Sequence, residues 1–344
     1  MLKNLHQWLP SYIASRLTAQ EKPLKGKPVN VAFCFVDHFE PCWNKATYED
    51  EVRRIDTWVR EYPKLVEKHF DSKGRHPQHT FFYPQEQYRK EHLDKLAKLC
   101  KAGYGDVEIH LHHDNDTAEA LKNKLETFKK QLHSHGLLSV NEKGVIEYGF
   151  IHGNWALDNS RKDGRWCGVN NEIQVLKETG CYADFTMPSA PHETQTKKIN
   201  SIYYATGAPG KPKSHNSGVD VEVGKPPSGD LMIIQGPLAL NWKARKWGLI
   251  PKIENGDITG ANPPTPERID IWVKQHIHVK GEPNWIFVKI HTHGTQERHH
   301  ASLFGEAAGD MYSYLENKYN DGINYRLHYM ASREMYSVIK KIEQ

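Results

Sequence analysis

The chain has 344 residues, enough for one α/β barrel with long loops or for two modest domains. Lysine and arginine number 46 against 42 aspartates and glutamates, a net charge of +4, and so small an excess excludes the basic footprint of a nucleic-acid-binding protein. No apolar run approaches the roughly 20 residues that cross a bilayer, and the five cysteines form no CxxC pair, so we expect a cytoplasmic protein without a membrane partner.

Strand and helix signals alternate along almost the whole chain. Residues 1–28 are expected to form a helix packed on the body of the protein and then a linker, and residues 29–344 a single domain. The predicted strands cover 29–37, 79–84, 106–112, 145–152, 182–187, 201–205, 231–235, 284–291 and 324–329. The predicted helices cover 48–70, with Pro63 kinking or dividing it, then 86–102, 117–136, 171–180, 267–278 and 304–319, and a last helix begins at Ser332.

Alternating strands and helices with short connections indicate a mainly parallel sheet with helices outside it. Roughly seven such units favour a closed or nearly closed barrel over an open sheet. Three segments are expected to be loops or loop insertions: 153–169, 206–229 and 236–266. In α/β barrels the chemistry lies where strands end and loops begin.

Histidines and aspartates gather at the ends of predicted strands. Residues two apart in a strand project to the same face, so His110 pairs with His112 and His291 pairs with His293. Catalytic zinc sites take three such side chains and leave a position open for water. The candidate ligands at four strand ends are Asp37, His38, His110, His112, His113, Asp114, Asp116, His152, His291 and His293. The pattern therefore predicts a metal-dependent hydrolase.

Several segments also follow the order of a known family. Phe35-Val36-Asp37-His38 ends the first strand, His79-Thr80-Phe81-Phe82 is in the second, and Glu108-Ile109-His110-Leu111-His112 is in the third. Phe287-Val288-Lys289-Ile290-His291-Thr292 follows late in the chain, and Tyr325-Arg326-Leu327 precedes the last helix. From about residue 29 onward the chain resembles the polysaccharide deacetylases, metal-dependent carbohydrate esterases with a distorted (β/α)7 barrel.

This resemblance implies a metal triad of His38, His112 and Asp116, with aspartate and histidine exchanged at two of the family's positions. It implies Asp37 as the general base and His291 as the general acid in the hydrolysis of an amide or ester by a water molecule activated at the metal. The cofactor that it implies is one divalent metal ion, zinc in the first place and nickel or cobalt as alternatives.

The substrate implied is an acylated carbohydrate, with N-acetyl as the first choice of acyl group. Substrate contact or support of the ligands is assigned to His110, His152, Trp155 and His293. The choice between His110 and His112 as the ligand stays open, because strand ends twist and bulge. The oligomeric state is also open.

Two other functions compete with this interpretation. An amidohydrolase or phosphoesterase would use the two HxH pairs to hold two or more metal ions, but its first strand would normally carry HxH where this chain has Asp37-His38. A non-catalytic barrel would bind a saccharide or a partner protein, with the exchanged ligands as relics of lost catalysis.

Overall fold

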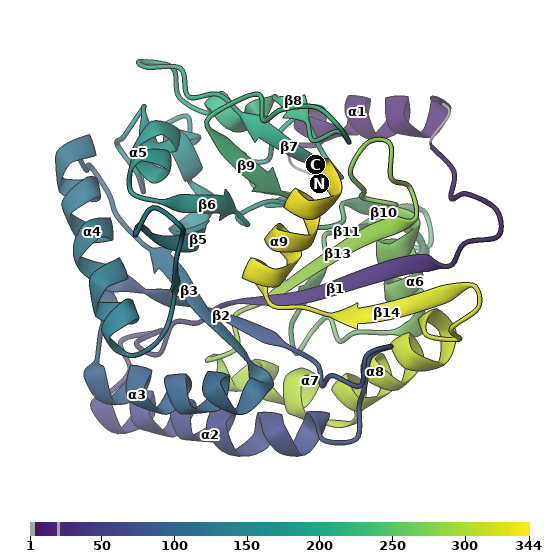
Figure 1. Ribbon diagram of the computed structural model, residues 1–344, viewed down its shortest axis with the longest axis horizontal. Coiled ribbons are helices and arrows are strands. Elements are labelled where there is room, and N and C mark those ends of the chain that lie inside the picture. The colour runs from purple at the N-terminus through teal and green to yellow at the C-terminus, as the bar shows by residue number, and fades with distance from the viewer. Residues whose placement is uncertain (1–3, 19–20) are drawn as a thin grey trace.

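The computed structural model describes residues 4–18 and 21–344 of the chain (Figure 1). Its strands are β1 (Val29–His38), β2 (His79–Pro84), β3 (Gly105–Leu111), β4 (Ser139–Val140), β5 (Ile146–His152), β6 (Cys181–Asp184), β7 (Ile202–Ala205), β8 (Val219–Asp220), β9 (Leu231–Ile234), β10 (Ala239–Lys246), β11 (Ile250–Glu254), β12 (Asp257–Ile258), β13 (Trp285–Thr292) and β14 (Tyr325–Tyr329). Its helices are α1 (Leu5–Leu17), α2 (Tyr48–Val66), α3 (Lys90–Leu99), α4 (Ala118–Ser134), α5 (Glu172–Glu178), α6 (Pro266–Lys274), α7 (His300–Phe304), α8 (Glu306–Tyr319) and α9 (Ser332–Glu343).

The main sheet is mostly parallel, as predicted. Parallel strands lie side by side in the order β13-β1-β2-β3-β5-β6-β9, with β12 beside β13 and the antiparallel β7 and β8 beyond β9. Among the described residues no strand pairing joins the two ends of this sheet, so closure into a barrel stays a prediction. The two ends do approach each other, because a Cβ on Gly236, just after β9, would lie 2.4 Å from the carbonyl oxygen of Lys289 in β13.

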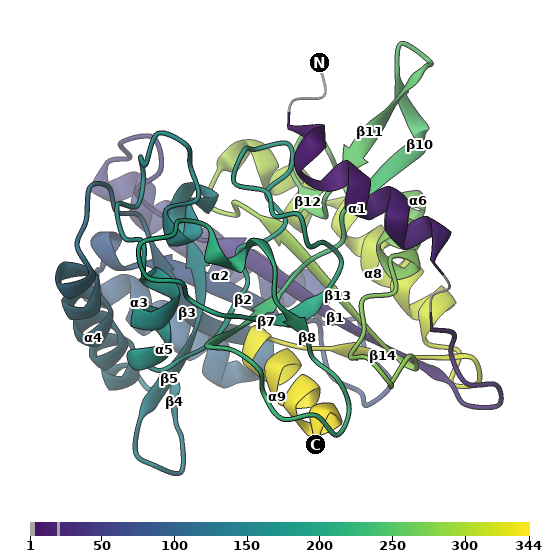
Figure 2. The ribbon, with the colours of Figure 1, turned by 90° about the horizontal axis from the view of Figure 1, so that it is seen from above.

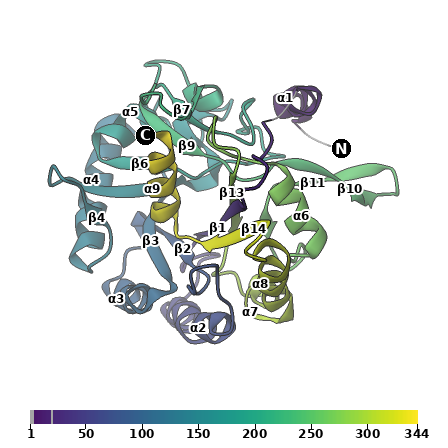
Figure 3. The same cartoon turned by 45° about the vertical axis from the view of Figure 1, so that its right-hand side comes forward.

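Both faces of the sheet are buried, and β1 shows why. Its side chains alternate, so Phe33 and Phe35 join the core beneath the outer helices, together with Trp58 of α2. Ala32, Cys34 and Val36 point to the other face and belong to the second core. Met335 of α9 packs in the same core. Figure 3 shows α2, α3, α4 and α8 around the outside of the sheet and α9 near its centre.

Local sequence signals explain where several helices begin. The hydroxyl of Thr117 accepts a hydrogen bond from the backbone N–H of Ala120 and caps α4, which starts next to the predicted position 117. Thr47 and Asp50 form a capping box at the start of α2. Pro63 does not divide α2, which runs on to Val66. The proline removes one backbone N–H donor, and the helix ends within one turn after it.

The segment 236–266 differs from the predicted loop, because it forms the β10–β11 hairpin and the short β12. Figure 2 shows this hairpin projecting from the body of the protein. Most of β10 is exposed, and Trp242 and Trp247 are 53% and 74% exposed. A strand such as β10, whose side chains are exposed on both faces, lacks the alternation of apolar and polar residues by which strands are recognised in a sequence.

The N-terminal helix packs on the body of the protein as expected. Trp8 of α1 is fully buried against Ala190 and Leu238. Residues 1–3 and 19–20 of the predicted 1–28 segment lie outside the described residues. Within the described part of the chain, no helix has the length and apolar character needed to span a membrane.

Candidate active site and metal centres

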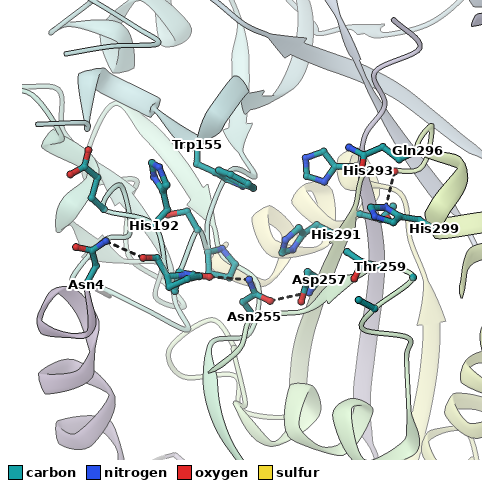
Figure 4. Close-up of a pocket in the computed structure, with 18 of the residues that line it drawn as sticks. Asn4, Trp155, His192, Asn255, Asp257, Thr259, His291, His293, Gln296 and His299 are labelled. Carbon is teal, nitrogen blue, oxygen red and sulfur yellow. Dashed lines mark hydrogen bonds between the residues drawn. The ribbon is translucent and has the colours of Figure 1, made fainter. Parts of the chain in front are cut away.

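A cleft of about 1330 Å³ opens at the carboxyl end of β13. Figure 4 shows His291 and His293 facing Trp155, with His192 beyond it. The cleft is also lined by polar side chains from several loops, among them Arg161, Glu193, Asn255, Asp257, Gln296, Arg298 and His299. One concave site thus combines an aromatic face with many hydrogen-bonding groups, which is the usual character of a small-molecule site.

A first cluster of potential metal ligands lies beside the cleft and consists of His38, Glu40 and His110. Each offers a nitrogen or oxygen atom, and these atoms lie within 4.8 Å of one another. His38 ends β1, Glu40 follows two residues later, and His110 is near the end of β3. The imidazole of His38 stacks on that of His293 at 4.6 Å between ring centres, and His293 lines the cleft.

The hydrogen bonds around His110 fix the atom that it presents to the cluster. Its Nδ1 lies 2.7 Å from the carbonyl oxygen of Ile151, so Nδ1 carries a proton and donates it. Its Nε2 faces Oε1 of Glu40 at 3.3 Å. A nitrogen lone pair and a carboxylate oxygen at this distance require a proton or a cation between them, and the backbone-anchored ring is typical of a metal ligand.

His112 lies at the edge of this cluster, between two carboxylates. Its Nε2 is 3.3 Å from Oε1 of Glu40, and its Nδ1 is 2.6 Å from Oε1 of Glu86. Burial opposes the charged imidazole, but the two carboxylates outweigh it and raise the pKa of His112 to about 10. His110 is therefore a member of the compact cluster, and His112 supports it through Glu40.

The electrostatics of the cluster suit a cation. Burial, and then the neighbouring imidazole of His293, hold the pKa of His38 well below its usual range. Burial alone would raise the pKa of Glu40, but its contacts with the side chains of His110 and His112 lower it below the usual range. A neutral imidazole and an ionised carboxylate are the forms that bind a divalent metal ion.

Asp37, the predicted base, lies on the other side of β1 from His38. Its carboxylate is fully buried, accepts a hydrogen bond from the backbone N–H of Gly294 at 2.6 Å, and lies 3.0 Å from Nε2 of His79. Neighbouring residues of a strand point to opposite faces, which puts Asp37 beneath the helix layer. Its side chain does not line the cleft and instead fixes the loop that follows His293.

A second cluster of potential ligands consists of His113, His152, Cys167 and Glu172. The Nε2 atoms of His113 and His152 are 2.9 Å apart, and Oε1 of Glu172 lies 3.2 Å from the first and 3.4 Å from the second. Sγ of Cys167 is 3.5 Å from Oε2 of Glu172. All four residues are buried, and none of the four lines the cleft.

The structure divides the predicted triad between these two places. His38 belongs to the first cluster, and His112 contacts its Glu40. Asp116 is on the side of the second cluster, where its Oδ2 lies 3.1 Å from Nδ1 of His113 and 2.6 Å from Nζ of Lys124. The three residues are therefore not brought together.

The other predicted site residues are also divided between the cleft and the clusters. His291, His293 and Trp155 line the cleft, and His152 is in the second cluster. Sequence reasoning missed three cluster members, Glu40, Cys167 and Glu172. Glu40 had a signal, an H-x-E spacing at a strand end, whereas Cys167 lies in a loop and Glu172 at the start of a short helix.

No model of a known protein family matches the chain, and no curated protein matches it. The resemblance to the polysaccharide deacetylases therefore rests on the sequence segments quoted above.

Proposed function

We propose that the cleft is the active site of a metal-dependent hydrolase that removes an acyl group, N-acetyl in the first place, from a carbohydrate. The observation that carries this proposal is the first cluster, His38, Glu40 and His110, beside a cleft at the carboxyl ends of parallel strands. In α/β folds the active-site residues lie at these strand ends. A distorted (β/α)7 barrel of deacetylase type and a cytoplasmic location, expected from the unpaired cysteines, are part of the proposal.

His38, Glu40 and His110 would hold one divalent ion. Two imidazole nitrogens and a carboxylate oxygen form the donor set of a catalytic zinc site and also suit nickel or cobalt, whereas magnesium and calcium prefer oxygen atoms alone. When bound, such an ion supplies a Lewis acid for the scissile carbonyl and lowers the pKa of a water molecule. Glu86 orients His112, which in turn holds the Glu40 carboxylate.

His291 is the proton carrier in this proposal. It lines the cleft, and burial, together with the nearby charge of Lys289, holds its pKa well below the usual range. A neutral imidazole first accepts a proton from water and then returns it to the leaving amine or alcohol. Asp37 is a positioning residue here, because its hydrogen bond from Gly294 fixes the loop next to His293.

The lining of the cleft supports a carbohydrate substrate. A pyranose ring offers an apolar face that stacks on an aromatic side chain, and its hydroxyl groups need hydrogen-bonding partners around the edge. Trp155 provides the aromatic face, and Arg161, His192, Asn255 and Asp257 provide the partners.

The test combines metal analysis with a search for turnover. Protein purified without a histidine tag is loaded with zinc, nickel or cobalt and assayed for acetate release from N- and O-acetylated sugars. His110→Ala should lose both turnover and one metal ion per chain, whereas His133→Ala, a control at an exposed histidine of α4, should retain both.

The same experiment separates the rival functions. Hydrolysis of phosphate esters in place of acetyl groups would contradict the proposal and favour a phosphoesterase. Binding of sugars without turnover under any metal would favour the non-catalytic barrel.

A further inference from the structure

The second cluster is a different kind of site from the first, and nothing in the proposed reaction uses it. Its four donors come from four separate places: His113 follows β3, His152 ends β5, Cys167 lies in the loop after β5, and Glu172 begins α5. Side chains so far apart in the sequence meet in a buried space where every polar atom requires a partner.

The outer contacts of the two histidines fix which ring atoms face inward. Nδ1 of His152 lies 2.6 Å from the carbonyl oxygen of Gly153 and donates its proton there. Nδ1 of His113 lies 3.1 Å from Oδ2 of Asp116. The proton of His152 therefore sits on Nδ1, whereas Nδ1 of His113 lies beside the carboxylate without forming a hydrogen bond. An imidazole backed by a backbone carbonyl or a carboxylate is the usual arrangement around a bound metal ion.

The close contacts of the cluster are more than the protons of two neutral rings can satisfy. The two Nε2 atoms are 2.9 Å apart, and Oε1 of Glu172 faces both. The proton of His152 is on Nδ1, so either Nε2 of His113 faces Nε2 of His152 without a hydrogen between them, or Nδ1 of His113 faces the Asp116 carboxylate without one. Hydrogen-bond donors and acceptors inside proteins are normally matched, and here one close contact is unmatched in either tautomer. A cation bound by both imidazoles and the Glu172 carboxylate resolves the conflict.

We propose that His113, His152, Cys167 and Glu172 form a structural zinc site, closed to substrate, that fastens the loop between β5 and α5. Two imidazoles, one thiolate and one carboxylate complete the four-coordinate shell that structural zinc sites have, and the thiolate selects zinc over magnesium or calcium. On binding, the Cys167 thiol gives up its proton to solvent and the sulfur bonds to the metal.

The loop between β5 and α5 requires such a fastening. Trp155, Asp158, Asn159 and Trp166 have left-handed backbone conformations, with φ from 51° to 66°, which non-glycine residues rarely adopt and which the surroundings must enforce. The loop also comes very close to the connection between β3 and α4, because a Cβ on Gly168 would lie 2.7 Å from the backbone nitrogen of Asp116.

The same loop connects the second cluster to the cleft. Glu172 accepts a hydrogen bond from the backbone N–H of Asp158 at 2.6 Å through its second oxygen, Oε2. Trp155 and Arg161, on either side of Asp158, line the cleft. The second cluster thus holds one wall of the cleft in place without contacting a ligand there.

The cysteine makes this proposal testable independently of catalysis, because the first cluster contains no sulfur. Full-length protein loaded with cobalt should show the near-ultraviolet charge-transfer absorption of a cobalt–thiolate bond. Cys167→Ser should abolish this absorption and remove one metal ion per chain. Cys181→Ser, at a buried thiol that contacts the carbonyl oxygen of Ala183 instead, should retain both.

His110→Ala separates this proposal from the proposed function, since it should keep the cobalt–thiolate absorption whether or not the first cluster binds metal. Wild-type protein without that absorption, or Cys167→Ser protein that keeps it, would overturn the proposal. If Cys167→Ser does not fold, X-ray absorption at the zinc edge of the wild-type protein decides, because a zinc–sulfur distance of about 2.3 Å is expected and its absence refutes the site.

Discussion

The two histidine clusters are both buried and are built from similar side chains, but they differ in their number of donors and in how they lie relative to the cleft. The first has three donors and lies beside the cleft, with His112 at its edge 28% exposed. The second has four donors, which are buried like those of the first; the carbonyl oxygen of Gly153 lies behind His152, and the Asp116 carboxylate lies 3.1 Å from Nδ1 of His113. Catalytic metal sites keep a coordination position open and structural sites fill it. We therefore propose the first cluster as the site that reacts and the second as the site that holds the fold.

The elements that supply the donors differ in the same way. The first cluster draws on the ends of β1 and β3, which the sheet already holds rigidly. The second draws on two strand ends and also on an irregular loop and the first residue of α5. A metal ion contributes most to stability where the backbone has few other constraints.

The largest effect should come from removing the carboxylate of the first cluster. Glu40→Gln should lower turnover by about 10³-fold or more, because a Lewis acid is worth several kcal/mol of transition-state stabilisation. The measurement is the rate of acyl release at saturating metal. Glu178→Gln, at an exposed ion pair with Lys122, is the control. Unchanged turnover in Glu40→Gln would show that the first cluster has no role in the reaction.

The second cluster should act on stability. Cys167→Ser should lower the free energy of unfolding by about 3 kcal/mol, because the loss of a structural metal is among the larger effects of a single substitution. Denaturant titration measures this, with Cys181→Ser as the control. A chelator should lower the free energy of unfolding of the wild-type protein nearly to that of Cys167→Ser. It should leave the free energy of unfolding of the variant almost unchanged. Equal sensitivity of both to the chelator would contradict the structural role.

A smaller effect is expected from the carboxylate behind His113. Asp116→Asn should weaken metal binding at the second cluster by about 10- to 100-fold, because it removes the charge that orients the ligand. Titration of the cobalt–thiolate absorption measures this affinity. Asp94→Asn is a matched control, since Asp94 contacts Nδ1 of His135 at 2.8 Å outside both clusters. If Asp116 were instead a ligand of the first cluster, the substitution would abolish turnover and leave this titration unchanged.

The smallest effect should be on substrate affinity. Trp155→Ala should raise KM by about 10-fold and leave kcat nearly unchanged, because it removes an aromatic contact made equally in the ground and transition states. Steady-state kinetics separate the two parameters. Trp242→Ala, on the exposed β10 strand, should change neither. A fall in kcat alone would mean that Trp155 acts on the chemistry.

Much of the scaffold could be predicted because its signals are local. The apolar run of β1, the strand at 79–84 and the start of α4 all lie where the sequence indicated. The β10–β11 hairpin could not be predicted, because β10, which is mostly exposed, carries no apolar alternation. The gap at Gly305 between α7 and α8 also escaped prediction, since the sequence indicated one helix from 304 to 319.

By itself the sequence determined that histidines and carboxylates stand at the ends of parallel strands, because strand periodicity and strand ends are properties of short segments. Only the tertiary structure decided which of these side chains belong to the first cluster, to the second cluster or to neither. The face on which each strand end points turned Asp37 away from His38, and the path of the loop after β5 brought Cys167 and Glu172 to His113. These arrangements depend on contacts between residues that are distant in the chain, and a local sequence pattern does not contain that information.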